Sequence, residues 1–319
     1  MIEMKQDTIS LKKGFDKFIV YCEVKNLSEM TIQYYKDGFN YFNHYLKLAN
    51  HKENKKTEIE AEAITKKTVD NYILAMRKMD IKDSTINIRL RSIRAILYYL
   101  MEEGDVSYFK IKLISETTES KKLYTDDDIK KLLKRPNKKK CNFSEYRTWA
   151  LENFFVATGV RSRSARNVRI QDLDFENDLI YIDVTKSRKG LVIPMSVSLK
   201  KVLIEYLAVR KGKLEDYVFC NPEGKQLTKD ALNNIIAKYN RQRDIEKTGV
   251  HLFRHYYAKK YIQNGGDCLK LQKLLGHSSL EMTKRYVELY AIDLQVDYDK
   301  LNPLDTMFGM RERIKMKVG

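Results

Sequence analysis

Apolar side chains in the first third of the chain recur with the roughly 3.6-residue period of an α-helix. The repeat runs through four segments: Thr8–Val24, Ser28–Leu48, Thr65–Met79 and Ser84–Glu103. Such spacing places the apolar residues on one face of each helix. Ser28 and Ser84 stand at the start of two segments and suit helix N-caps. The pattern therefore predicts a unit of four helices within residues 1–112.

A polar segment follows this unit. The apolar period is lost between Ser107 and Leu123, and residues 115–122 are all polar or charged. Stretches of this kind are typical of connections between domains. We predict a linker over residues 113–123 and, from the length of 319 residues, two domains.

The second part of the chain combines strand and helix patterns. Three short segments alternate with a period of two and predict an antiparallel sheet: Val168–Phe175, Leu179–Val184 and Leu191–Pro194. Helical periodicity follows in Leu199–Arg210, Lys229–Asp244, His251–Asn264, Leu269–Leu275 and Ser279–Leu294. The predicted fold class is mainly α with a small antiparallel β-sheet, and the second domain by itself is α+β.

Three consecutive aspartates, Asp126 to Asp128, stand near the start of the second domain. They are compatible with a metal site or with a helix N-terminus. Because Thr125 is followed three residues later by an acid and then by Ile129 and Leu132, the spacing favours a capped helix start.

The amino-acid composition excludes several classes of protein. Hydrophobic residues make up 43% and charged residues 32%, which is enough to build a core. Apolar runs are far shorter than the roughly 20 residues that cross a bilayer, and the first residues lack the apolar block of a signal peptide. The four cysteines have no metal-ligand or disulfide-framework spacing. We expect a soluble, cytoplasmic protein with reduced thiols and without bound metal.

The formal charge of +17 indicates a polyanionic partner. It is uneven, with a net +2 in residues 1–120 and +15 in residues 121–319. The densest run comprises Lys130, Lys131, Lys134, Arg135, Lys138, Lys139 and Lys140, and Arg163, Arg166 and Arg169 follow later. These residues are candidates for contacts with DNA phosphates, although a run of this kind is also compatible with a solvated helix end.

No glycine-rich phosphate loop, dinucleotide fingerprint or His-Glu-x-x-His motif is present, so no cofactor is predicted. The candidate chemistry is cationic instead. His251, Arg254 and His255 are spaced to share a helix face, and a guanidinium beside the imidazoles favours an anion over a metal ion. Taken alone, the triplet is equally compatible with an ordinary surface cluster. Ser278 and Glu281 have capping-box spacing, which predicts a helix that begins just after His277.

Five motifs stand in a characteristic order along the second domain. They are Thr158-Gly159-Val160-Arg161, Lys186 in the predicted hairpin, His251-x-x-Arg254, Leu275-Gly276-His277, and Tyr286 nine residues after His277. This series resembles the tyrosine recombinase (phage integrase) family. The resemblance implies a helical core-binding domain at 1–112, a catalytic domain at 124–302 and a C-terminal tail at 303–319. Such a tail either docks in a neighbouring subunit or is a frayed terminus.

The resemblance implies a site-specific DNA recombinase that cleaves and rejoins strands through a covalent 3′-phosphotyrosine. It assigns a phosphate clamp to Arg161 and Arg254, a general acid to Lys186, a proton acceptor or relay to His251, a phosphate donor to His277 and the nucleophile to Tyr286. These residue types suit the chemistry, because guanidiniums bind nonbridging oxygens in pairs and a phenol can attack phosphorus. The implied partners are double-stranded DNA with paired recombination sites, clamped between the two domains, and further copies of the chain in a tetramer.

Some positions leave alternatives open. Ser164 stands where the family usually has an acidic residue. Tyr290 lies one turn beyond Tyr286 and is a second candidate nucleophile, and Lys189 is a second candidate for the role of Lys186. The rival functions are a DNA-binding architectural or regulatory relative without strand transfer, and a type IB topoisomerase that relaxes DNA.

Overall fold

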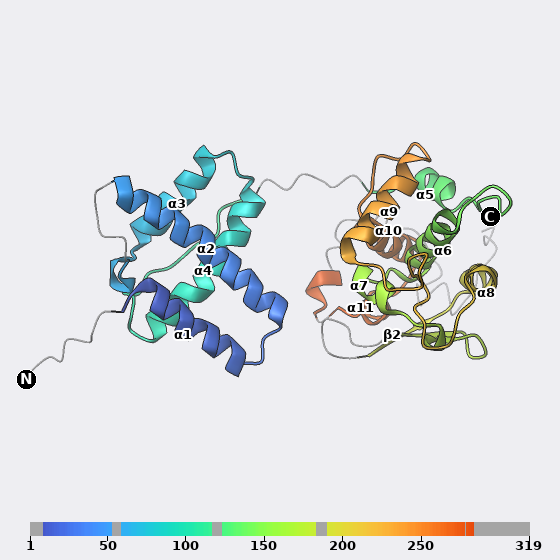
Figure 1. The fold of residues 1–319 in the computed structure, drawn as a ribbon, viewed down its shortest axis with the longest axis horizontal. Coiled ribbons are helices and arrows are strands. Elements are labelled where there is room, and N and C mark those ends of the chain that lie inside the picture. Colours follow the sequence, from blue (N-terminus) through green and yellow to red (C-terminus); the bar gives the residue numbers. More distant parts are fainter. Residues whose placement is uncertain (1–8, 53–58, 117–122, 183–189, 278, 284–319) are drawn as a thin grey trace, which may run out of the picture. The chain divides into compact units, whose positions relative to one another are not determined.

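The computed structural model describes residues 9–52, 59–116, 123–182, 190–277 and 279–283. The chain divides into two compact units, Met1–Ser120 and Lys121–Gly319 (Figure 1). The first unit is helical, and the described part of the second adds a three-stranded antiparallel sheet to its helices. The predicted fold class is therefore confirmed. None of the described helices is long and apolar enough to cross a membrane.

Helices dominate the described part of the first unit. They are α1 (Leu11–Val24), α2 (Glu29–Lys52), α3 (Lys66–Lys78) and α4 (Asp83–Glu102), with a 3-10 turn, η1 (Ala61–Ala63), before α3. Their apolar faces meet in one core, in which the rings of Phe15 and Phe39 stack 3.9 Å apart. α2 and α4 cross closely at Gly38, because a Cβ there would lie 2.0 Å from Ser92 Oγ. The four predicted helices are therefore present and packed together.

The start of α4 differs from the prediction. The helix begins at Asp83, with Lys82 in the N-cap position and without a capping side chain, so Ser84 lies inside the first turn. The helix dipole favours an acid in the first turn, which explains why the helix begins at Asp83, one residue before the serine. Ser28, by contrast, accepts a hydrogen bond from the backbone N–H of Thr31 at 3.2 Å, as a cap should.

The segment that leaves the first unit is fixed to α4. Asn87 is buried, donates from Nδ2 to the carbonyl of Ile114 at 2.9 Å and accepts from the N–H of Ile114 at 3.0 Å. Tyr98 accepts from the N–H of Ile111 at 3.1 Å. Leu113 and Ile114, at the start of the predicted linker, also pack against the core of the first unit.

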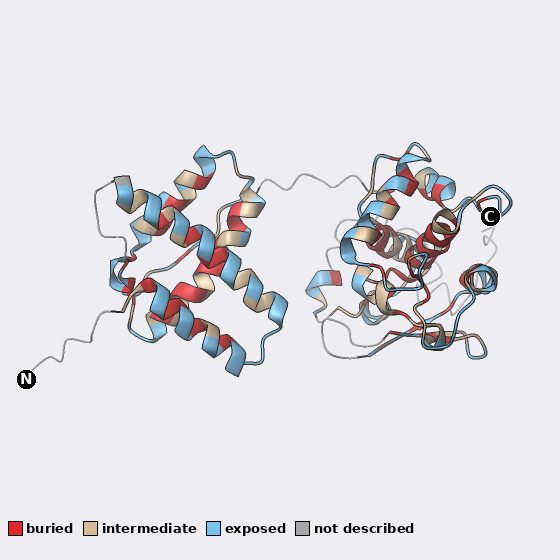
Figure 2. Ribbon diagram, viewed as in Figure 1, coloured by how far each residue is buried: buried red, intermediate tan, exposed pale blue. Residues whose placement is uncertain are grey.

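The second unit is built around a buried helix. Its elements are α5 (Asp126–Leu132), α6 (Phe143–Thr158), α7 (Ser162–Asn167), η2 (Ile170–Asp172), β1 (Leu173–Asp174), β2 (Leu179–Ile182), β3 (Leu191–Pro194), α8 (Val197–Arg210), α9 (Lys229–Arg241), α10 (Val250–Gln263) and α11 (Cys268–Leu275). α6 contacts α8, α9 and α10 and is buried along most of its length (Figure 2). A helix covered from several sides has apolar residues all round rather than one stripe.

The sheet has the order β1-β2-β3, with Leu173 opposite Ile180 and Ile180 opposite Ile193. The predicted first strand, Val168–Phe175, is reduced to two residues, because Ile170–Asp172 forms the 3-10 turn η2. The backbone N–H groups of Ile170 and Gln171 donate to carbonyls of the loop after α8, at 2.9 and 2.8 Å. The carbonyls of that loop accept from N–H groups that, in a longer strand, would have donated within the sheet.

The acidic start of the second unit is a helix cap. Thr125 accepts from the N–H of Asp128 at 3.1 Å, and Asp128 accepts from the N–H of Thr125 at 2.8 Å. Asp128 also pairs with Lys247 at 2.6 Å. The prediction of a capped helix is confirmed, and no cluster of metal-ligating side chains is found among the described residues.

Candidate active site

The turn after α6 presents Arg161. α6 ends at Thr158, whose hydroxyl donates to the carbonyl of Phe154 at 2.6 Å. Gly159 follows in the left-handed conformation with φ 62°, and Arg161 is the N-cap residue of α7. A Cβ at Gly159 would lie 2.5 Å from the ring of Tyr257. Only glycine tolerates both this φ and this close approach, so the glycine permits the sharp turn that leads to Arg161.

Helix α10 carries His251, Arg254 and His255. The rings of the two histidines meet edge to face, with their centroids 4.8 Å apart. The prediction that these residues share one helix is confirmed. Arg254 is only 3% exposed, so its positive charge lies within the unit.

Arg254 joins the ends of two other helices. Its Nη1 donates to the carbonyl of Gly159 at 2.9 Å, and its Nη2 donates to the carbonyl of Leu275 at 2.8 Å. Gly159 caps α6, and Leu275 is the last residue of α11. Helix C-termini carry unsatisfied carbonyls and partial negative charge. These contacts explain how a buried guanidinium is stabilised at this place.

The segment after α11 brings His277 to the same place. Gly276 caps α11 in the left-handed conformation with φ 59°. The N–H of His277 donates to the carbonyl of Gln272 at 3.1 Å, and Arg161 donates from Nη1 to the carbonyl of Gly276 at 3.5 Å. In the Leu-Gly-His motif, the leucine therefore supplies a carbonyl for Arg254, the glycine makes the turn, and the histidine brings an imidazole.

The imidazole of His277 is neutral at neutral pH. Burial, reinforced by the positive charges of Arg254, Arg161 and His251, lowers its pKa to about 4. Its Nδ1 lies 2.7 Å from Oγ1 of Thr283, which is fully buried. The two arginines and two histidines therefore act on one another electrostatically, although they come from three separate parts of the sequence.

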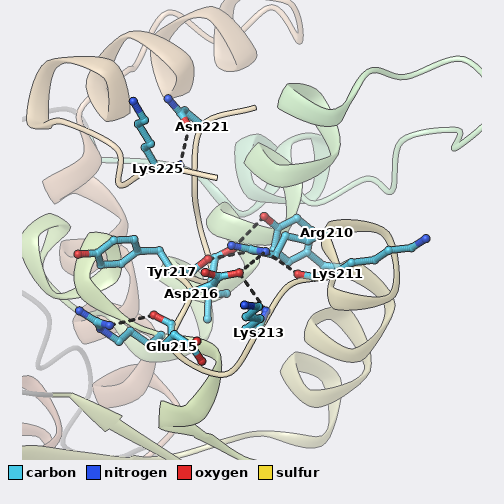
Figure 3. A network of polar contacts seen from close by, with 11 residues as sticks. Arg210, Lys211, Lys213, Glu215, Asp216, Tyr217, Asn221 and Lys225 are labelled. Carbon is cyan, nitrogen blue, oxygen red and sulfur yellow. Dashed lines mark hydrogen bonds and ion pairs between the residues drawn. The ribbon is translucent and has the colours of Figure 1, made fainter. Parts of the chain in front are cut away.

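The loop after α8 is held by a polar network (Figure 3). Arg210, at the end of α8, donates from Nε to the carbonyl of Tyr217 and from Nη1 to that of Lys211, at 3.0 and 2.5 Å. Arg169 donates to the carbonyl of Glu215 at 2.9 Å and lies over the ring of Tyr217. The chain that follows Arg161 and α7 is thereby attached to the loop after α8.

The predicted site residues divide into two groups. Arg161, His251, Arg254 and His277 are brought together. Lys186 and Tyr286 lie outside the described residues, as do the alternatives Lys189 and Tyr290 and the tail at 303–319. Ser164 lies within α7, next to the turn that carries Arg161.

The basic candidates differ in exposure and in surroundings. Lys130, Lys131, Lys134, Arg135, Lys138, Lys139, Lys140 and Arg163 are exposed. Arg135 and Lys138 both pair with Glu205, whereas Lys130 pairs with Asp127 at 3.3 Å. Arg166 and Arg169, whose direction the sequence left open, donate to backbone carbonyls.

Two further buried residues of the second unit were not predicted. Thr283 contacts His277, and its only signal in the sequence is its place between His277 and Tyr286. Glu152 lies wholly buried in the middle of α6, and neither carboxyl oxygen has a hydrogen-bond partner among the described residues. An acid within the otherwise mainly apolar segment Trp149–Ala157 was the available signal for Glu152.

Comparison with known proteins places this arrangement in a family. A model of the phage integrase family matches residues 122–291. Tyrosine recombinase XerC of Thermodesulfovibrio yellowstonii is 27% identical over 292 residues, which cover 88% of this chain and 92% of the relative. Tyrosine recombinase XerD of Listeria innocua is 25% identical over 299 residues, which cover 90% and 98%.

Solved structures share the fold. The Tn1549 transposon integrase in complex with transposon right end DNA matches with a TM-score of 0.73 and 18% identity, covering 93% of this chain and 99% of that one. A lambda integrase tetramer bound to a Holliday junction matches with a TM-score of 0.66 and 15% identity, covering 88% and 78%. Since the family model spans more than half of the 319 residues, the chain belongs to the phage integrase family of tyrosine-type site-specific recombinases.

Proposed function

We propose that this protein cuts and rejoins double-stranded DNA at paired specific sites through a covalent 3′-phosphotyrosine on Tyr286. The observation that carries the proposal is the convergence of Arg161, Arg254 and His277, from three separate segments, at the ends of α6 and α11. The order of these residues along the chain matches the family pattern, and Tyr286 follows His277 at the family's spacing.

The two arginines would stabilise the phosphate that reacts. Attack on phosphorus increases the charge on its nonbridging oxygens, and guanidinium groups held in place can bind these oxygens in the transition state. Because Arg254 is fixed to two helix ends, it would need little rearrangement during the reaction. The neutral imidazole of His277 would act as a hydrogen-bond donor to the same phosphate.

Proton transfers would accompany the strand exchange. The phenol of Tyr286 loses a proton as it attacks phosphorus, and His251 is the proposed acceptor or relay. The leaving 5′-oxygen gains a proton, for which Lys186 is the proposed general acid. The phosphotyrosine retains the energy of the broken bond, so a 5′-hydroxyl of another strand can displace the tyrosine and reseal the DNA.

The surface charge supports binding to the DNA backbone. Lys130, Lys131, Lys134, Lys139, Lys140 and Arg163 are exposed and are the proposed phosphate contacts. A tetramer on two paired sites is the proposed assembly, supported by the likeness to a lambda integrase tetramer on a Holliday junction. The biological reaction would be integration or excision of a mobile element, or resolution of DNA.

The test begins with covalent capture, which recovers the target sequence together with the attached protein. Protein is incubated with nicked fragments of the source genome, denatured with SDS, and the DNA that stays attached is sequenced. The recovered site is then built into a nicked suicide substrate. We expect a protein–DNA adduct on a denaturing gel, formed by wild type and by Tyr290→Phe but not by Tyr286→Phe.

Other outcomes have defined meanings. Loss of the adduct in Tyr290→Phe alone would move the nucleophile by one turn. DNA binding without any adduct in the wild type would contradict the proposal and favour a DNA-binding protein without strand transfer. An adduct accompanied by relaxation, but never by recombinant product from two sites, would favour a topoisomerase.

A further inference from the structure

We propose that Thr283 is a positioning residue that fixes the imidazole of His277 as the tautomer with its proton on Nε2. This inference rests on the proposed function, because His277 is the proposed phosphate donor. It concerns a residue that neither the sequence motifs nor the family pattern stated above includes.

The geometry of the pair is that of a hydrogen bond. Oγ1 of Thr283 lies 2.7 Å from Nδ1 of His277, within the normal range for a hydroxyl and a ring nitrogen. Thr283 is fully buried, so water does not compete for its hydroxyl. Its backbone is fixed as well, since its N–H donates to the carbonyl of Leu280 at 2.9 Å.

The number of available protons decides the direction of this bond. The threonine hydroxyl has one proton, and Nδ1 of His277 is its only acceptor among the described residues. If Nδ1 carried a proton and donated it, the buried hydroxyl proton would have no acceptor there, which is costly. The hydroxyl therefore donates to Nδ1. A neutral imidazole has a single ring proton, which then resides on Nε2.

The consequence for the site is a directed donor. Burial and the nearby positive charges keep His277 from taking a second proton, so a neutral ring can offer one N–H at most. With Nδ1 occupied by Thr283, that N–H lies on the opposite edge of the ring. A ring in the other tautomer would present a lone pair at Nε2, which would repel a phosphate oxygen instead of binding it.

The test uses variants that differ at one hydroxyl. Thr283→Val removes the hydroxyl and keeps the branched shape, and Thr283→Ser retains the hydroxyl. Thr148→Val is the matched control, because Thr148 is also buried and donates from Oγ1 to the carbonyl of Ser144 at 2.7 Å, but contributes nothing to the proposed chemistry. Urea unfolding of each variant establishes that it is folded.

The first readout is independent of activity. NMR of ¹⁵N-histidine-labelled protein distinguishes the two neutral tautomers by their ring nitrogen signals. The chain has five histidines, and the signal that disappears in His277→Gln is that of His277. We expect the Nε2–H pattern for His277 in wild type, Thr283→Ser and Thr148→Val, and a mixture of tautomers in Thr283→Val. An Nδ1–H pattern in wild type, or an unchanged pattern in Thr283→Val, would overturn the proposal.

The second readout is the rate of adduct formation on the suicide substrate. Loss of a hydrogen-bond partner that orients a metal-ligating histidine typically reduces activity by about 10–100-fold, and we expect an effect of the same order for His277. We expect Thr283→Val to form adduct at least about tenfold more slowly, with unchanged DNA binding and with rescue by Thr283→Ser. If wild type forms no adduct, the proposed function fails while the tautomer measurement still decides the role of Thr283. An equal rate in Thr283→Val would refute that role in the reaction.

Discussion

The guanidinium of Arg254 donates to the backbone carbonyl of Gly159, with 2.9 Å between Nη1 and the oxygen. The donor lies on α10 and the acceptor caps α6, 95 residues away in the sequence. Because Nη2 donates at the same time to Leu275 at 2.8 Å, one planar side chain connects the C-termini of α6 and α11. The residue that is proposed to clamp the phosphate is thus also a structural link between two helices.

Arg254→Lys is expected to weaken both roles. An ammonium group lacks the planar fork that reaches two carbonyls, so one buried carbonyl loses its donor. The free energy of unfolding should fall by about 1–3 kcal/mol, measured by urea denaturation, and adduct formation should be lost. Arg163→Lys, at an exposed position, is the control and should leave the unfolding curve unchanged. Unchanged stability in Arg254→Lys would contradict the structural role.

Gly159→Ala tests the turn before Arg161. The change introduces strain at φ 62° and a contact of 2.5 Å with the ring of Tyr257. Strain of this backbone conformation costs of order 1–3 kcal/mol, and overpacking adds a similar amount. We expect a lower melting temperature and a slower rate of adduct formation, since the carbonyl that holds Arg254 moves.

Gly224→Ala separates these two causes. Gly224 has φ 80°, but nothing lies within 4 Å of a Cβ placed there. Its substitution should therefore show only the cost of the backbone conformation. If Gly159→Ala is no more destabilising than Gly224→Ala, the close approach to Tyr257 is not a constraint on the site.

Glu152→Gln should change the pH dependence of stability. Burial raises the pKa of the Glu152 carboxyl well above its usual value, so the folded state retains the proton. The stability that this proton provides is complete below the pKa of the unfolded chain and is lost as pH rises toward the folded pKa. At pH values above both pKa values, each unit of difference between them lowers the free energy of unfolding by about 1.4 kcal/mol.

The glutamine variant has no proton to lose. Its free energy of unfolding should resemble that of wild type near pH 4 and exceed it near pH 8, in urea titrations at both values. Glu223→Gln, an exposed position, should give curves parallel to wild type. A gain for Glu152→Gln that is equal at both pH values would show that Glu152 does not titrate as described.

The basic residues between positions 130 and 140 should contribute unequally to DNA binding. Glu205 neutralises part of the charge of Arg135 and Lys138, whereas Lys139 and Lys140 are exposed without a described acidic partner. Replacing both Lys139 and Lys140 with Ala should reduce the slope of log K against log salt by about 0.9 for each phosphate that is no longer bound. Replacing Arg135 and Lys138 should change it less. Equal slopes for the two double variants would contradict this distinction.

Local features of the fold were accessible from the sequence because they depend on neighbours along the chain. The four helices of the first unit follow from apolar periodicity, and the Thr125–Asp128 capping box follows from a spacing of three residues. The first strand of the predicted sheet was wrong because a distant segment competes for its hydrogen bonds. Residues 170–172 form a 3-10 turn because the loop after α8 binds their backbone N–H groups.

The order of the motifs was likewise readable, and with it the family and the candidate residues Arg161, His251, Arg254 and His277. The contacts that these residues make could not be predicted from the sequence. A sequence does not state that the carbonyls of Gly159 and Leu275 face one guanidinium, or that Glu205 lies beside Arg135 and Lys138. These relations require α6, α10 and α11 to pack in one particular way.

The sequence by itself thus determined the elements, the class of the fold and the identity of the residues proposed to react, since these depend on local periodicity and on residue types in order. Only the tertiary structure decided the state of those residues. The burial of Arg254 and the neutral charge of His277 result from side chains distant in sequence and from the exclusion of water. The hydrogen bond between His277 and Thr283, six residues apart, forms at a place where the fold buries the threonine. Charge state and orientation depend on surroundings that exist only once the chain has folded.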